Sequence, residues 1–208
     1  MSQELCVSKF IVVANSLCLD FVNTQIIQGG ELVDLLENFS DFACWLVAVQ
    51  VLDPGEVKGV IKSWGNTSEG QHTFERALAF RLVLRRMVQQ IVGGQGAPPE
   101  AMEEINKLLH YRIHSRELVQ EQGRFITRTH TTFEEAVHLL TPIAEAASDL
   151  LVQADFSLIK KCENPECILY FYDTSKNRVR RWCSMSLCGN RMKAAAFYRR
   201  RRGSTTAN

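Results

Sequence analysis

Four of the seven cysteines form two identically spaced pairs in the last quarter of the 208-residue chain, and this spacing restricts the fold more than any other feature. Four residues separate the members of each pair and fifteen separate the pairs, whose members are Cys162, Cys167, Cys183 and Cys188. Tetrahedral zinc takes four thiolates, and two short loops that each supply two of them close at a modest entropic cost. Four protein ligands leave no coordination position open, so the spacing predicts one structural Zn²⁺ per chain. The alternative is four buried thiols without a metal.

The total number of cysteines indicates the cellular compartment. An odd number of cysteines, in a chain whose start lacks the pattern of a signal peptide, indicates reduced thiols. No apolar run approaches the roughly 20 residues of a membrane span. We therefore expect a cytoplasmic protein without a membrane partner.

The net charge of +1 conceals two parts of opposite character. Residues 160–202 carry twelve Lys or Arg side chains against three acids, which gives +9, while the rest of the chain carries −8. A concentrated basic segment is typical of polyanion binders, because each phosphate that it neutralises releases condensed counterions. The charge distribution thus favours nucleic-acid binding by the C-terminal segment.

Apolar periodicity predicts a mainly α protein. Helices are expected over about 40–52, 54–64, 73–92, 99–114 and 132–154, with a short hairpin over 117–129 that turns at Gly123. Residues that favour strands occupy 156–161 and 168–172, on either side of the first cysteine pair, and predict a two-stranded ribbon. A further helix is expected after Cys188.

These elements divide the chain into three expected parts. Residues 1–157 should form a multihelical domain with a short β-hairpin, residues 158–202 a zinc-bound β-ribbon plus helix, and residues 203–208 a disordered tail. A segment of about 45 residues is too small to bury an adequate core alone, so the second part should depend on its metal. We expect the two folded parts to have separate cores.

Two stretches carry a resemblance to known families. CENPEC, then YDTSKNRVRRWCSMSLCGNR, then MKAAAFYRRRR, within residues 159–202, resembles the CGNR-type zinc finger of bacterial regulators. LCLDFVNT, residues 17–24, resembles the opening signature of the stress-induced transcription regulator domain that precedes this finger. The resemblance implies a zinc-dependent, DNA-binding transcription regulator of the stress response, with double-stranded DNA as its partner. Its N-terminal domain would sense an effector or form a homodimer.

Basic residues on both sides of the second cysteine pair are candidates for the DNA contacts. Arginine binds guanine edges or phosphates bidentately, so the helix is suited to base edges and the loop to the DNA backbone. The predicted contacts are Arg178, Arg180, Arg181, Asn190, Arg191, Lys193, Arg199, Arg200, Arg201 and Arg202. In the alternative interpretation, the last four arginines are a disordered tail with non-specific affinity, and a loop arginine pairs with an acid of the same segment.

Two further arginines fall in the middle of an apolar helical stripe, because Arg81 and Arg85 lie within roughly 20° of Phe74 on a helical wheel. A buried charge without a partner costs several kcal/mol, so both side chains need a carboxylate or an anion. The candidate carboxylates within the chain are Asp20, Asp34 and Glu37. The alternatives are an internal salt bridge and a small anionic effector. Asp20 and Asn23 are either turn formers or further members of that ligand site.

Catalytic motifs provide no support for an enzyme. The sequence contains no glycine-rich phosphate loop and no nucleophile elbow, and it shows no convincing acid–base pair. We therefore expect a protein that is not an enzyme. Two alternatives remain open, namely an RNA- or protein-binding zinc module and an enzyme whose N-terminal domain binds an anionic substrate.

Overall fold

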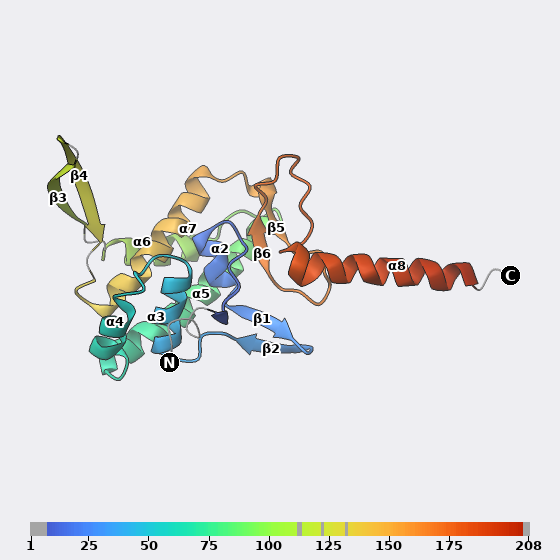
Figure 1. Cartoon of the computed structure of the whole chain (residues 1–208), viewed down its shortest axis with the longest axis horizontal. Coiled ribbons are helices and arrows are strands. Elements are labelled where there is room, and N and C mark those ends of the chain that lie inside the picture. Colours follow the sequence, from blue (N-terminus) through green and yellow to red (C-terminus); the bar gives the residue numbers. More distant parts are fainter. Residues whose placement is uncertain (1–7, 112–113, 122, 132, 206–208) are drawn as a thin grey trace.

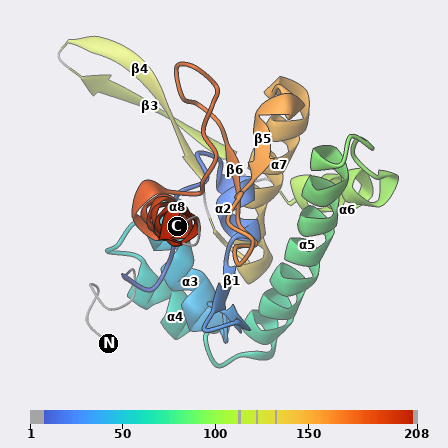
Figure 2. The ribbon, with the colours of Figure 1, turned by 90° about the vertical axis from the view of Figure 1, so that its right-hand side faces the viewer.

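A computed structural model describes residues 8–111, 114–121, 123–131 and 133–205, and their side chains outside 114–117, 128–131 and 200–205. Helices surround a shared apolar interior, and α5 runs along one side of it (Figures 1 and 2). The helices before the cysteine segment are α2 (Leu17–Val22), α3 (Phe39–Ala48), α4 (Val57–Trp64), α5 (Ser68–Val92), α6 (Pro99–Leu109), the 3₁₀ helix η1 (Ala136–Leu140) and α7 (Thr141–Gln153). The mainly α prediction is confirmed.

Capping residues set several helix ends. Helix α5 begins at Ser68, earlier than expected, because the Thr67 hydroxyl accepts a hydrogen bond from the Gly70 amide. Helix α3 likewise begins before the predicted cap at Ser40, since the Asn38 side chain accepts from the amide of Asp41. Helix α6 ends at Leu109 rather than 114, where the chain already enters a strand.

Two antiparallel hairpins leave the helical body. The predicted hairpin is confirmed and is longer than expected, with β3 (His114–Glu121) paired to β4 (Arg124–Thr131); it stands away from the body in both views (Figures 1 and 2). The other, β1 (Gln25–Gln28) with β2 (Glu31–Asp34), was not predicted. Its two-residue turn consists of Gly29 and Gly30, whose φ angles of 62° and 89° are easily adopted only by glycine.

The core continues from the helical body into the cysteine segment. Phe21, Phe42 and Trp45 pack their rings together among fully buried side chains of α5 and α7. The same buried cluster includes Phe171 and the four cysteines of the two pairs. The expectation of two separate cores is therefore wrong, because apolar side chains bridge the expected boundary near residue 157.

Among the described residues, no helix combines the length and the apolar character needed to cross a membrane.

Asp20 fixes the chain that enters α2 and gives the fold a measurable pH dependence. Its Oδ1 accepts hydrogen bonds from the amides of Val13 and Ala14, 2.9 and 3.0 Å away. Burial raises the pKa of Asp20 to about 6, despite the opposing effect of these hydrogen bonds and of the Arg180 charge. A raised carboxyl pKa means that the folded state binds the proton more tightly than the unfolded state, so this group's contribution to stability is lost as pH rises from about 4 to 6.

Asp20→Asn keeps the acceptor oxygen and removes the titration. We expect the unfolding free energy of the variant, relative to the wild type, to rise by about 1 kcal/mol between pH 5 and 7. Urea unfolding of both proteins across this range measures the difference, from which all other titrating groups cancel. A difference that stays constant with pH would contradict the raised pKa.

Candidate zinc centre and nucleic-acid interface

The C-terminal segment places its four cysteines on two knuckles. A short ribbon pairs β5 (Ile159–Lys161) with β6 (Tyr170–Tyr172), after the 3₁₀ helix η2 (Phe156–Leu158). Cys162 follows β5 and Cys167 precedes β6, as the sequence predicted. Cys183 precedes the short π-helical turn η3 (Met185–Gly189), which contains Cys188 and leads directly into α8 (Asn190–Thr205).

The four sulfur atoms have the arrangement of a closed zinc site. All four side chains are buried, and their Sγ atoms lie within 4.8 Å of one another. Cys183 Sγ is 3.9 Å from that of Cys167 and 3.6 Å from that of Cys188, close to the ~3.8 Å edge of a tetrahedron with zinc–sulfur bonds of about 2.3 Å. These cysteines bind one structural Zn²⁺, which supplies the cross-link that the small module needs.

Polar groups around the cluster favour thiolates. The Asn164 amide donates to Cys188 Sγ over 3.3 Å, and the backbone amide of Cys183 donates to Cys162 Sγ over 3.4 Å. Hydrogen bonds from the Cys167 and Cys183 thiols, followed by those from the backbone amides of Cys183 and Asn164, lower the pKa of Cys162, while the thiol hydrogen bonds with Cys162 and Cys167 raise the pKa of Cys183. Asn164 was missed by the sequence interpretation, although its place inside the knuckle CENPEC was a usable signal.

The expectation of reduced thiols holds only in part. Cys18 and the four zinc ligands form no disulfide, whereas Cys44 is disulfide-bonded. The prediction of a fully reduced chain is therefore wrong at Cys44. Odd cysteine number cannot show which individual residues pair.

Gly189 lets the second knuckle close against an aromatic ring. A Cβ atom at this position would lie 2.6 Å from the sulfur of Met185 and 3.2 Å from the ring of Trp182. The half-buried indole of Trp182 packs against the core cluster. A side chain at position 189 would therefore displace the end of the exposed Met185 side chain and press on the Trp182 ring.

Hydrogen bonds fasten the ribbon to the start of the N-terminal domain. The side-chain amide of Asn23 donates to the Tyr170 carbonyl over 2.8 Å, and its oxygen accepts from the Tyr170 amide over 2.9 Å. The Tyr172 amide donates to the Ala14 carbonyl over 2.8 Å, while the Asn15 side chain donates to the Tyr172 carbonyl over 3.1 Å. Asn23 and Asp20 are therefore placed as structural contacts of the fold.

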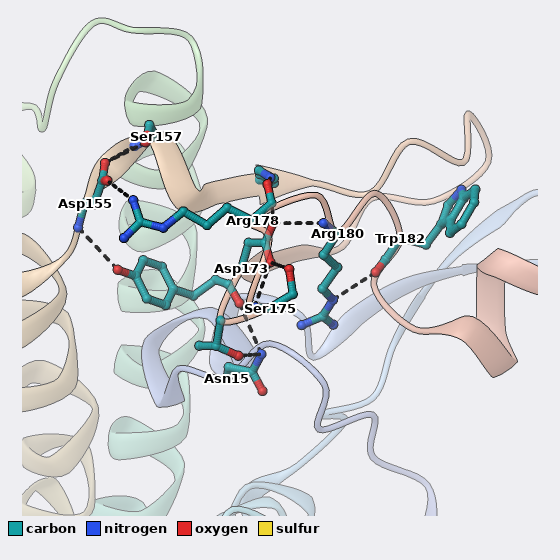
Figure 3. Close-up of polar contacts among 11 residues, drawn as sticks. Asn15, Asp155, Ser157, Asp173, Ser175, Arg178, Arg180 and Trp182 are labelled. Carbon is teal, nitrogen blue, oxygen red and sulfur yellow. Dashed lines mark hydrogen bonds and ion pairs between the residues drawn. The ribbon is translucent and has the colours of Figure 1, made fainter.

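Arg180 and Asp173 complete this seam (Figure 3). The Arg180 guanidinium lies 4.2 Å from the ring centre of Phe171 and donates to the carbonyls of Val13, Trp182 and Cys183. Asp173 is 1% exposed and accepts from Lys160 Nζ over 2.6 Å. Burial alone would raise the pKa of Asp173, but hydrogen bonds from Lys160, Ser175 and the Arg180 amide hold it well below its usual range.

The other predicted DNA contacts lie on the surface around the second knuckle. Arg178 and Arg181 are exposed on the loop, where they meet Asp155 and Glu163 at 3.6 and 2.5 Å. Arg191 is exposed on the first turn of α8, and its Nε donates to the Leu187 carbonyl over 2.8 Å. Asn190, Lys193 and Arg199 are exposed on the same helix. Residues 200–202 continue it, and α8 also takes in residues 203–205 of the expected tail; residues 206–208 lie outside the described part.

The two arginines of α5 have different surroundings. Arg81 is buried and forms a two-pronged ion pair with Asp34, and it donates to the Thr24 hydroxyl over 2.8 Å. Arg85 is half-buried and donates to the Val22 carbonyl over 2.5 Å. Its Nε has no hydrogen-bond partner among the described residues, and burial lowers the pKa of this side chain. The internal salt bridge is thus present at Arg81, while the anionic effector stays a prediction that involves Arg85.

Comparisons with protein families agree with this arrangement. Residues 15–154 match the family model named ABATE, "Putative stress-induced transcription regulator". Residues 159–201 match the model of the CGNR zinc finger. No curated protein matches the chain. The two family models follow each other in the order that the sequence predicted, and the boundary between them lies between α7 and β5.

Proposed function

The chain belongs to the ABATE family, and from this premise we propose that it is a zinc-dependent transcription regulator that binds double-stranded DNA through its CGNR zinc finger. In this proposal the zinc site has a structural role. It fixes the direction in which α8 leaves the protein, and α8 enters the major groove.

The observation that carries the proposal is the free, basic helix α8. Its 16 residues span about 24 Å, and it extends away from the body with only its first turn close to the knuckle (Figure 1). An α-helix of this kind fits the major groove of B-DNA. The basic residues along it are Arg191, Lys193, Arg199, Arg200, Arg201 and Arg202.

The surroundings of each arginine decide which of the predicted DNA contacts belong to the proposed interface. Arg180 is occupied by carbonyls and the Phe171 ring, so we leave it out of the proposed interface. Arg178 and Arg181 are exposed and paired with surface acids, which are weak pairs that phosphates can replace. They would contact the DNA backbone, while Arg191 and Asn190 at the start of α8 would read base edges.

The N-terminal domain would carry the regulatory part of the function. Because Arg85 retains an unpartnered Nε, a small anionic effector would bind beside it. Together with a homodimeric state, a cytoplasmic location and a role in stress, this forms the rest of the proposed regulator. An enzyme that binds its substrate through the arginine pair is less well supported, because Asp34 already neutralises Arg81.

A salt titration of DNA binding tests the proposal. We expect Arg200→Gln, Arg201→Gln and Arg202→Gln together to weaken binding to all sequences and to reduce the salt slope by about 0.9 for each lost phosphate contact. The matched control removes the same charge from exposed positions of the body, with Lys58→Gln, Lys62→Gln and Arg86→Gln. Equal losses of DNA affinity in both triple variants would mean that the effect comes from the net charge of the protein and not from contacts of α8. Absence of DNA binding by zinc-loaded protein would instead favour the RNA- or protein-binding alternative.

Arg191→Ala should behave differently from the charge variants. If Arg191 reads a base, its loss costs about 1 to 3 kcal/mol on the preferred site and much less on scrambled DNA. The preferred site is first selected from a random library, and zinc content is checked because Arg191 also lies 3.8 Å from Cys188 Sγ. Equal losses on both DNAs would make Arg191 a phosphate or structural contact.

A further inference from the structure

The unpredicted hairpin β1–β2 lies beside the start of α8. Both elements project from the same end of the molecule (Figure 1), and in the view along α8 the hairpin lies to one side of the helix (Figure 2). A groove of about 720 Å³ separates them. Its lining residues are Ile27, Gly29, Gly30, Pro165, Glu166, Ile168 and Arg191.

The face of α8 that carries Arg191 continues beyond the groove. Ala194, Ala195 and Tyr198 fall within roughly 60° of Arg191 around the helix axis, and all are exposed. The two alanines allow close approach to this face, and the arginine supplies a positive charge at its beginning. A polyanion that lies along this face of α8 therefore passes the tip of the hairpin.

The tip has the chemistry of a phosphate contact. The last pair of the β1–β2 ladder is Gln28 with Glu31, so the amides of the two glycines lie beyond the ladder. A Cβ atom added to either glycine would meet nothing within 4 Å, so space is open on this side. Backbone amides that a ligand can approach closely are common phosphate donors.

The remaining walls fit the sugar rather than the phosphate. Ile27, Pro165 and Ile168 provide apolar surface on both sides of the groove, which suits the deoxyribose edge of a DNA strand. Glu166 is the one acid in the lining, and Glu31 follows the tip. These two carboxylates would oppose a phosphate and thus limit the affinity.

We propose that hairpin β1–β2 is a second wall of the DNA site: α8 lies in the major groove with Arg191 towards the base edges, and the sugar–phosphate strand that flanks this groove lies between the start of α8 and the Gly29–Gly30 tip. The inference rests on the proposed function and extends it, because it assigns a DNA contact to the N-terminal domain. The zinc finger and the N-terminal domain would then both contact the same DNA duplex.

A charge placed at the tip tests the contact. Gly29→Asp and Gly29→Asn both suit the positive φ of this turn and differ only in charge. We expect Gly29→Asp to weaken binding of a selected duplex about five- to tenfold at 0.1 M salt, with a smaller loss at higher salt, and Gly29→Asn to bind as the wild type. Glu31→Gln and Glu166→Gln should each tighten binding.

Gly123 provides the matched control. It has a φ of 78° at the turn of β3–β4, and an added Cβ atom would meet nothing within 4 Å. The β3–β4 hairpin lies on the opposite side of the molecule from α8 (Figure 1). Gly123→Asp changes net charge equally and should leave affinity unchanged. Suppose that the wild type binds DNA and that the arginine triple variant loses binding. Equal effects of Gly29→Asp and Gly123→Asp would then overturn the hairpin contact and leave the proposed function intact.

Two further outcomes would also count against the inference. No duplex binding by the wild type would overturn both the proposed function and the hairpin contact. A Gly29→Asp effect seen only with single-stranded RNA would assign the groove to another partner.

Discussion

Cys188→Ser is expected to remove the bound zinc and to destabilise the helical body together with the finger. The core cluster contains Phe171 and the zinc ligands next to the buried rings of α2 and α3, and Asn23 holds Tyr170 at both its amide and its carbonyl. A structural zinc contributes on the order of 10 kcal/mol to the folding of such modules, which is comparable with the 5–15 kcal/mol stability of a whole domain. Loss of the finger exposes the apolar side chains of the body on which it rests.

The measurement combines zinc analysis with thermal and urea unfolding followed by circular dichroism. We expect the wild type to contain one zinc per chain and to unfold in one transition, and Cys188→Ser or chelated protein to have a transition lowered by at least 10 °C. Cys18→Ala removes a buried thiol that is not a zinc ligand and should retain the full zinc content. A variant with lost zinc and an unchanged main transition would restore the interpretation of two independent cores.

The zinc site could be predicted from the sequence because its information is local. Two equal spacings define the ligands, and tetrahedral coordination then determines how the knuckles meet. The β3–β4 hairpin was likewise visible from its strand-forming residues and Gly123. The tip Gly29–Gly30 carried a signal of the same kind for β1–β2, and only its short, half-exposed strands concealed it.

The direction of polar side chains could not be predicted. Arg180 belongs to a basic segment, so its charge is evident from the sequence. The sequence does not reveal that its guanidinium donates to the backbone carbonyls of Val13 and Cys183. Asn23 and Tyr170 are separated by 147 positions, so their pairing depends on how the whole body packs. When the role of a residue depends on such a distant partner, its charge or its place in a periodic pattern does not predict that role.

The ion pair between Arg81 and Asp34 is expected to respond asymmetrically to the loss of either partner. The Arg81 side chain is 5% exposed, whereas 33% of the Asp34 side chain reaches solvent. Asp34→Asn leaves a buried guanidinium without its counter-charge, and arginine cannot release its proton. We expect this variant to lose about 3 to 5 kcal/mol of stability, the cost of breaking a buried pair.

Arg81→Met preserves most of the buried volume and leaves a carboxylate that water can reach. We therefore expect a smaller loss of about 1 to 3 kcal/mol from this variant, which also removes the hydrogen bond to Thr24. The double variant should be more stable than the sum of the single losses implies, because neither isolated charge remains. Urea unfolding of the wild type, the two single variants and the double variant at pH 7 gives the four free energies of this double-mutant cycle. Equal losses in the single variants would contradict the expected asymmetry. A double variant with fully additive losses would mean that the pair contributes little and that Arg81 is stabilised by its hydrogen bonds and packing alone.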